Sequence, residues 1–541
     1  MRTSRRSLRF TLVLLTAVTL GVAGCTQSAS PQSSTPASTA PKVLTIGASF
    51  VIKSLDPGRT IETTSNMINH SVYDSLVTFA GEDLKTALPS IATEWKISAD
   101  SKTYTFTLRQ GVKFASGNPM TADDVKWSFE RVKNLKSNPA FLLNSVVSID
   151  VPDPQHVVLN LSESHTDLLA ILSSASVAIL DAKLLKQNGA DASATANDLD
   201  KAETYLNAHS AGTGPYMLQT YTPEQEVVLV RNPNYWRAAG KSDRVVIRNI
   251  TESATQKLQV EAGSLDIAIT LGPDQVNALK GSAGVTSKAS PSATTFYVLI
   301  NNNPAVGGAF SNPKVQQAVR YALDYDGILA LVGLGAVRLA GVIPTLFPGS
   351  LDSSQAPKMD REKAKALLKE ANLGEVKGTI SYSSDPTSQG VQVSVLVQKI
   401  QSDLTAVGMA ITLNGTTRAT ALQDYRDAKN QIGVWSWAAD WPDASNFLVF
   451  APGRTVGKRA GWLEDASPQA KDIADTARKA ESETDSAKRA ALYQQFEQKL
   501  RDFGPFVPMF QPAVPYAFRS NVKGVTFNSV WGVDLYAVSK E

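Results

Sequence analysis

A single cysteine, Cys25, stands in a chain of 541 residues. No intramolecular disulfide can therefore form to stabilise the protein. A chain without such a cross-link must rest on a large apolar core, and a chain of this length has the surface to bury one. The cysteine content thus predicts a fold whose stability comes from a large apolar core rather than from disulfides.

The first residues have the layout of a secretory signal peptide. Residues 2–9 carry four arginines and no acid, and the apolar run 10–22 that follows is too short and too poorly flanked for a membrane span. The run ends in Val-Ala-Gly-Cys at residues 22–25, which resembles a bacterial lipobox. We expect a lipoprotein signal peptide over 1–24 and a lipid on Cys25 that anchors the protein to the cell membrane. General secretion and the twin-arginine route both fit, the latter because of Ser4-Arg5-Arg6.

Residues 25–42 are expected to form a disordered tether. Between Thr26 and Pro41 almost every residue is Thr, Ser, Ala, Gln or Pro. Such a composition buries too little apolar surface to become ordered. The segment would link the lipid to the folded part of the protein.

The net charge argues against a nucleic-acid-binding protein. The formal charge of +3 includes the four arginines of the signal segment, so the mature chain would carry a formal charge of −1. Nucleic-acid-binding domains instead concentrate positive charge.

Strand and helix patterns alternate from Val43 to the end of the chain, without a low-complexity break or a visible repeat. This alternation favours interwoven α/β lobes. Residues 103–108 predict a strand with three threonines on one face and Tyr104, Phe106 and Leu108 on the other.

Two helices are equally clear in the sequence. Thr121 is expected to cap the first, whose apolar side chains recur at helical spacing at Val125, Phe129 and Val132. Asp360 is expected to cap the second, with Gly374 as its C-terminal stop. The apolar stripe of this helix consists of Ala364, Leu367, Leu368 and Ala371.

Several segments, spread from Leu55 to the C-terminus, match one known family in order. They are Ser54-Leu55-Asp56-Pro57, Val72-Tyr73-Asp74-Ser75-Leu76-Val77, Leu88-Pro89, Ala92-Thr93-Glu94-Trp95, residues 104–114, Gly117, residues 121–125, Phe129-Glu130-Arg131, Gly212-Thr213-Gly214-Pro215-Tyr216, residues 231–236, residues 262–266, residues 315–324, residues 437–443 and Asn446-Phe447. Together they make the chain similar to the large solute-binding proteins of peptide and nickel ABC importers, the extracellular family 5 or cluster C group.

The resemblance implies an α/β fold like that of type II periplasmic binding proteins. In such a fold two lobes are joined by a two-strand hinge, and the solute cleft lies between them. The implied division is lobe I over 43–272, with a subdomain at about 75–205, lobe II over 273–510, and a return to lobe I over 511–541. The implied partners are a small-molecule or peptide solute and the permease and ATPase subunits of an importer, with the binding protein acting as a monomer.

Asp440 is the strongest candidate for a solute-binding residue. In peptide-binding members of the family, the aspartate at this place pairs with the α-ammonium of the solute, so the resemblance implies this role for Asp440. The block also contains Trp437, Ala438 and Trp441, and indole faces give broad contact and accept cations. The alternative is an aspartate that caps the next helix, a role that Asp443 fills better. Because side chains alternate along a strand, Trp435 and Trp437 are expected on the same face, and the sequence leaves open whether one of them lies in the core instead of the cleft.

Three further residues are weaker solute-binding candidates. Glu62 and Thr63 follow Ile61, at the place where peptide-binding relatives offer main-chain hydrogen bonds to an extended solute. Such bonds need no particular side chain, so the residue types do not test this. Arg338 stands in a glycine-rich segment and could meet a solute carboxylate. The competing interpretation is a solvated arginine.

Enzyme and metal sites are not indicated. The Ser-x-x-Lys spacings at 311–314 and 520–523 lack the partner motifs of acylating serine enzymes, and Asn312-Pro313 reads as a helix start. Residues 212–216 lack the Lys-Ser/Thr of a phosphate loop and predict a turn into a strand. The four histidines are scattered, so neither a metal nor a cofactor is expected. Chelated nickel, an opine and an oligosaccharide stay open as solutes, and an exported hydrolase is the remote alternative.

Overall fold

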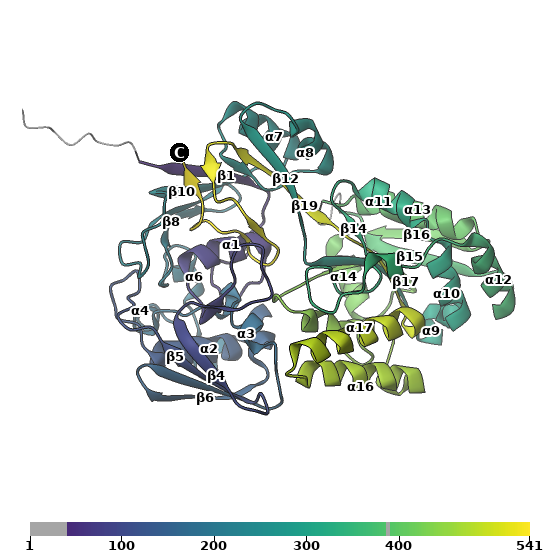
Figure 1. Cartoon of the computed structure of the whole chain (residues 1–541), viewed down its shortest axis with the longest axis horizontal. Coiled ribbons are helices and arrows are strands. Elements are labelled where there is room, and N and C mark those ends of the chain that lie inside the picture. The colour runs from purple at the N-terminus through teal and green to yellow at the C-terminus, as the bar shows by residue number, and fades with distance from the viewer. Residues whose placement is uncertain (1–40, 386–389) are drawn as a thin grey trace, which may run out of the picture. The chain divides into compact units, whose positions relative to one another are not determined.

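The computed structural model describes residues 41–385 and 390–541. The expected signal peptide, Cys25 and nearly all of the tether lie outside these ranges. Two large mixed sheets and one smaller antiparallel sheet carry the fold (Figure 1). No helix in the described ranges has both the length and the apolar character needed to cross a bilayer.

The first sheet has seven strands. Their spatial order is β12 (Val285–Pro291), β19 (Ala513–Arg519), β11 (Ile267–Ala268), β1 (Val43–Ala48), β10 (Arg244–Asn249), β9 (Glu226–Arg231) and β8 (Tyr216–Thr222). The central strand β1 runs parallel to β10 and β11, and the other neighbours pair antiparallel. Residues far apart in sequence therefore meet in one sheet, with β19 contributed by the C-terminal part of the chain.

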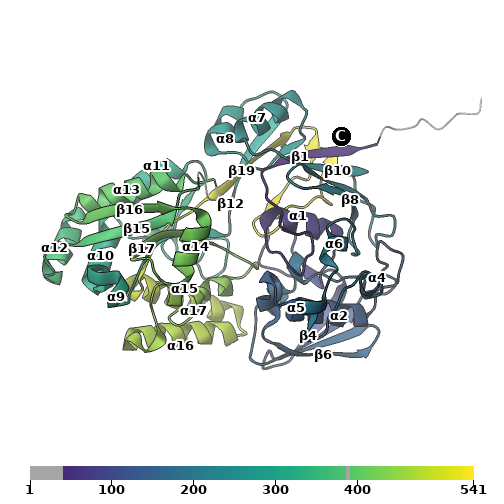
Figure 2. The same ribbon diagram turned by 180° about the vertical axis from the view of Figure 1, so that it is seen from behind.

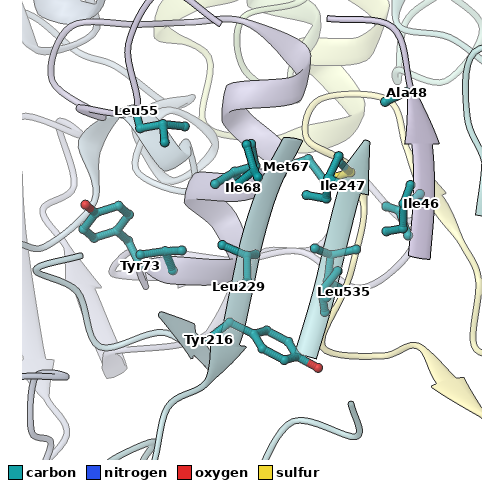
Figure 3. Close-up of a cluster of buried hydrophobic side chains, with 14 of the residues drawn as sticks. Ile46, Ala48, Leu55, Met67, Ile68, Tyr73, Tyr216, Leu229, Ile247 and Leu535 are labelled. Carbon is teal, nitrogen blue, oxygen red and sulfur yellow. The ribbon is translucent and has the colours of Figure 1, made fainter. Parts of the chain in front are cut away.

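Helix α1 (Thr63–Val72) packs against this sheet (Figure 3). Its buried Met67 and Ile68 belong to one apolar cluster with strand residues Ile46, Leu229 and Ile247. The C-terminal residue Leu535 joins the same cluster. This core is of the kind that a chain without disulfides requires.

A four-stranded antiparallel sheet follows β1 in sequence. Its spatial order is β4 (Ala92–Ile97), β5 (Thr103–Leu108), β7 (His156–Leu161) and β6 (Val146–Asp153). The predicted strand 103–108 is confirmed, with its aromatic and leucine face buried. The predicted helix is α2 (Ala122–Leu135), and the Asp124 carboxylate accepts a hydrogen bond from the Thr121 backbone N–H at 2.9 Å.

Smaller elements complete the N-terminal half. They are β2 (Val77–Thr78), β3 (Leu88–Pro89), η1 (Asn138–Leu143), α3 (Leu168–Ile171), η2 (Ala175–Val177), α4 (Ala182–Gln187), α5 (Ala196–Leu199), α6 (Glu203–Leu206), α7 (Ser253–Ala262) and α8 (Pro273–Leu279).

The turn predicted at residues 212–216 leads into β8, as expected. Its glycines are required by close packing against the end of α1. A Cβ atom on Gly212 would lie 2.3 Å from the Val72 carbonyl oxygen, and one on Gly214 would lie 2.5 Å from the Val72 carbonyl carbon. Any larger residue would push the turn away from the helix.

The second sheet has six strands. Their order is β14 (Val337–Arg338), β18 (Phe506–Gln511), β13 (Thr294–Ile300), β17 (Ile432–Ala438), β15 (Lys377–Ser383) and β16 (Ala410–Thr416). Strand β13 is buried along its whole length, between β17 and β18.

Several helices and short elements accompany the second sheet. They are α9 (Pro304–Gly307), η3 (Gly308–Ser311), α10 (Pro313–Ala322), α11 (Tyr325–Val332), η4 (Ser353–Gln355), α12 (Arg361–Ala371), α13 (Val393–Thr405), α14 (Arg418–Arg426), η5 (Ala444–Phe450), α15 (Thr455–Arg459), η6 (Glu464–Ala466), α16 (Pro468–Ser482) and α17 (Ser486–Phe503). The short C-terminal strands are β20 (Val522–Lys523), β21 (Phe527–Asn528), β22 (Gly532–Val533) and β23 (Ser539–Lys540).

Helix α12 is the second helix predicted from the sequence. Asp360 caps it through a hydrogen bond from the Lys363 backbone N–H at 2.9 Å, as predicted. The helix ends earlier than predicted, because Asn372 already adopts the left-handed conformation; Gly374, two residues later, has a positive φ of 69° as well. Asparagine is one of the few other residues that tolerate this conformation.

Two strand connections link the sheets. Strand β12 leads into β13, and β18 leads through Pro512 into β19, while β12 and β19 pair antiparallel (Figure 2). Helix α8 and β12 lie within the range expected for lobe II, yet β12 belongs to the first sheet. The first sheet thus includes residues beyond the boundary drawn at 272, since sequence patterns do not reveal a strand's distant partner.

Arg131 of α2 forms a fully buried ionic cluster. Its guanidinium donates to both carboxylate oxygens of Asp56, at 2.9 and 2.6 Å, and to those of Asp200, at 2.8 and 3.0 Å. Burial opposes the charge, but the two carboxylates outweigh it and raise the pKa of Arg131. The cluster joins α2 to the segment before α1 and to the end of α5. Asp56, which the sequence analysis gave only as part of a family motif, is thus an ion-pair partner in the fold.

We predict that Arg131→Met lowers the free energy of unfolding by about 3–5 kcal/mol, because Asp56 and Asp200 would lose their fully buried partner and keep only the partly exposed Arg59, at 3.3 and 2.9 Å. Urea denaturation measures this change. Arg478→Met is the control, since Arg478 pairs with Glu464 on the exposed surface and should cost under about 1 kcal/mol. Equal effects of the two substitutions would contradict the prediction.

Candidate functional site

A cavity of about 710 Å³ lies between residues of the N-terminal half and the second sheet. Ile61, Asn138, Phe141 and Asn144 line it from the N-terminal half. The other half contributes residues of β17, α14, η5 and α15, together with Phe296 of β13. A cavity of this size suits a small-molecule or short-peptide ligand.

Strand β17 delivers the aromatic wall of the cavity. Its first residues are buried between β13 and β15, and it emerges at Trp435 and Trp437, which are both half-buried. The Trp435 ring stacks on the Tyr425 ring with 4.3 Å between centroids. The sequence left open whether one of these two tryptophans lies in the core. In the structure each of them lines the cavity and also packs against the core.

Asp440 follows β17 by two residues and lines the same cavity. Burial raises the pKa of its carboxyl to about 6, and the Asn446 side chain opposes this shift. Asn446 is buried, and its Oδ1 accepts a hydrogen bond from Trp437 Nε1 at 2.8 Å. Trp437 therefore orients the amide that faces Asp440. The carboxylate has no cation within 4.0 Å in the described ranges.

Trp441, which follows Asp440 directly, lines the same cavity. Its Nε1 donates to Ser445 Oγ at 3.0 Å, and Ser445 Oγ donates to Asp167 Oδ2 at 2.6 Å. The ring of Trp441 lies 6.2 Å from that of Phe141, which reaches the cavity from η1. Trp441 is thus held by residues from both halves of the chain.

Asp443 has the capping role that the sequence assigned to it. Its Oδ1 accepts a hydrogen bond from the Ser445 backbone N–H at 2.8 Å at the start of η5. It also pairs with Arg489 at 2.7 Å. Asp443 is therefore occupied by structural contacts, which leaves Asp440 as the free carboxylate of this segment.

Four sequence candidates are not among the residues that line the cavity. Ala438 is exposed at the end of β17, and Glu62 and Thr63 lie at the start of α1, next to the lining residue Ile61. Arg338 lies on β14 with its guanidinium 4.3 Å from the Tyr325 ring centre. These placements separate them from Trp437, Asp440 and Trp441, which the fold brings together.

Most of the lining residues were not singled out as ligands by the sequence, among them Phe141, Tyr425, Asn446 and Arg459. Phe141 is unusual for its 40% exposure, but exposure cannot be read from the sequence. Arg459 lies at the end of the short helix α15, and no sequence pattern around it indicates a ligand-binding role. Only the position of Asn446, in the block after Asp440, hinted at a role.

The arrangement is suited to holding a cation without reacting with it. A half-buried carboxylate in a cavity that indole rings also line attracts an ammonium group more strongly than an exposed one does. In the described part of the chain, no three His, Cys, Asp or Glu side chains are gathered as metal ligands.

Relatives match this chain over nearly its full length. The chain is 28% identical over 494 residues to the probable D,D-dipeptide-binding periplasmic protein DdpA of Escherichia coli K12, covering 90% of this chain and 92% of that protein. It is also 28% identical over 569 residues to heme-binding protein A of Haemophilus influenzae, covering 97% and 98%.

Among solved structures, the fold is similar to the ABC transporter-associated periplasmic binding protein DppA from Helicobacter pylori in complex with the peptide STSA. The TM-score is 0.75 at 24% identity, covering 92% of this chain and 98% of that one. The expected fold class is therefore confirmed. The family model for the bacterial extracellular solute-binding proteins, family 5, matches residues 86–456. The chain belongs to this family, as the sequence motifs indicated.

Proposed function

We propose that this protein is the substrate-binding lipoprotein of an ABC importer and captures short peptides or related amine-bearing solutes. It delivers them, as a monomer and without catalysis, to the permease and ATPase subunits. A lipid on Cys25 holds it at the outer face of the cell membrane. The observation that carries the choice of solute is the Asp440 carboxylate, which lines the cavity without a cationic partner in the described ranges.

The free carboxylate favours a cationic group of the solute for a physical reason. Burial raises the pKa of Asp440 to about 6, so the empty pocket disfavours the charged form. A bound ammonium group supplies the missing counter-charge, and the low-polarity indoles of Trp437 and Trp441 strengthen the attraction. An oligosaccharide offers no such charge. An opine with an amino group and a chelated metal stay open as alternatives.

Closure around the solute is the proposed mode of capture. The paired strands β12 and β19 join the two sheets and would serve as the hinge between the lobes. Beside the cavity, Thr166 Oγ1 donates to the Glu481 carbonyl at 3.1 Å, and Ser445 donates to Asp167. These polar contacts between the halves support a closed state that shields the solute.

We predict that Asp440 selects solutes with a free amino group. Loss of the carboxylate would leave a bound ammonium without a partner, so Asp440→Ala should weaken Ala-Leu binding by roughly 2–5 kcal/mol. Acetylating the amino group of Ala-Leu should weaken binding to the wild type similarly but change little in Asp440→Ala, because both changes remove one interaction. Calorimetry on the four combinations measures this.

The matched control is Asp385→Ala, because Asp385 also lines the cavity but has a partner in Arg418 at 3.8 Å. This variant should still distinguish free from acetylated Ala-Leu. Equal binding of the two peptides by the wild type would refute the role of Asp440 and favour an opine, a sugar or a metal chelate.

The affinity for Ala-Leu should also depend on pH. Because the pKa of Asp440 is raised to about 6, its carboxyl is neutral below that pH and ionised above it. Binding should therefore strengthen from pH 5 to pH 7, while the peptide ammonium stays charged. Calorimetry over this range should give a flat profile for Asp440→Asn. A flat profile for the wild type would show that no ionised carboxylate is needed.

Membrane retention should depend on Cys25. The variant Cys25→Ala lacks the thiol that the lipid would modify, so it should leave the membrane fraction, whereas Thr26→Ala should stay there. Detergent phase separation followed by immunoblotting measures the distribution. Retention of Cys25→Ala in the membrane fraction would rule out the lipid anchor.

A further inference from the structure

Six charged side chains line the cavity: Asp385, Arg418, Arg426, Asp440, Arg454 and Arg459. Four are cations and two are anions, so the lining is positive overall. A charge that already has a partner in the protein needs none from a solute. The pairing of each group therefore predicts which charges a solute must bring.

Two of the four arginines have carboxylate partners. Arg454 Nη2 lies 2.7 Å from Glu481 Oε2, and Arg418 Nη1 lies 3.8 Å from Asp385 Oδ2. Asp385 therefore has a partner in Arg418. Within the described ranges, Asp440 is the only acidic side chain of the lining without a cationic partner.

Arg426 and Arg459 have no carboxylate within 4.0 Å in residues 41–385 and 390–541. The remaining residues, 1–40 and 386–389, contain no Asp or Glu at all, so no side-chain partner can come from them. The unpaired charges of the lining are therefore two guanidinium groups and one carboxylate.

Arg459 is the more informative of the two, because it is half-buried whereas Arg426 is exposed. Its guanidinium carbon lies 4.7 Å from the centre of the Tyr425 ring and 5.9 Å from the Trp437 ring. Aromatic faces hold a guanidinium in place but accept none of its strong hydrogen bonds. The N–H donors thus remain available for a planar anion, which arginine binds through two parallel hydrogen bonds.

We infer, on the basis of the proposed function, that the preferred solute carries two carboxylates besides its amine, as an acidic dipeptide does. Its ammonium binds Asp440, and its two carboxylates bind Arg459 and Arg426. A neutral dipeptide leaves one guanidinium of the cavity without a counter-charge. The cavity therefore selects for net negative charge as well as for the amino group.

Three dipeptides that differ only in carboxylates test the inference by calorimetry. Ala-Glu has two, Ala-Gln has one, and Ala-Gln amide has none. Each carboxylate removed should weaken binding to the wild type by at least about tenfold, the effect of losing a hydrogen-bonded charge. This comparison needs no variant and so does not depend on the folding of one.

Two substitutions then assign the arginines. Arg459→Gln should abolish one of the two affinity steps, and Arg459→Gln combined with Arg426→Gln should abolish both. Arg338→Gln is the matched comparison, because Arg338 is also half-buried over a tyrosine ring but does not line the cavity. It should keep both steps.

Equal affinity of the wild type for the three peptides would overturn the inference, as would two intact steps in Arg459→Gln. Loss of a step in Arg338→Gln would assign the carboxylate there instead and overturn it too. If binding requires the free amino group of the peptide but does not change when its carboxylates are removed, this inference is refuted and the proposed function stands. No binding of any of the three, nor of Ala-Leu, would refute the proposed function with it.

Discussion

The antiparallel pairing of β13 with β17 is the constraint on which the site depends. Residues 294–300 pair with residues 438–432 in a continuous register inside the second sheet. The first residues of β17 are buried in the sheet, and its last residues reach the cavity. The end of the strand therefore sets the positions of Trp437 and of Asp440, which follows two residues later. A shift of one residue in this register would turn both indoles of β17 to the other face of the sheet.

The chemistry of the cavity follows from incomplete charge pairing. In the cluster of Arg131 with Asp56 and Asp200, a fully buried charge is matched by charges of the protein itself. In the cavity, Asp440 has no such partner, and burial raises its pKa accordingly. An unpaired carboxylate favours binding of a cation for this reason. Desolvation makes the ionised carboxylate unfavourable in the empty site, and a bound solute of opposite charge offsets that unfavourable free energy.

Local elements were predictable from the sequence because their signals are local. The alternation in residues 103–108 and the Thr121 cap depend only on neighbours along the chain, and both predictions are confirmed. The motifs spread along the chain together indicated the family, and the block around Asp440 contained the cavity residues Trp437, Asp440 and Trp441. Arg459 and Tyr425 could not be found in this way, because only the folding of α14 and α15 beside β17 brings them to the cavity. The same limit applied to β12, whose partner β19 lies more than 200 residues away.

The central claim is that Asp440 binds the amino group of a solute in this cavity. A crystal structure of the protein with Ala-Leu would test it most directly. The account predicts the peptide ammonium within about 2.7–3.2 Å of an Asp440 carboxylate oxygen, next to the rings of Trp437 and Trp441. A peptide bound with its amino group away from Asp440, or outside the cavity altogether, would contradict it.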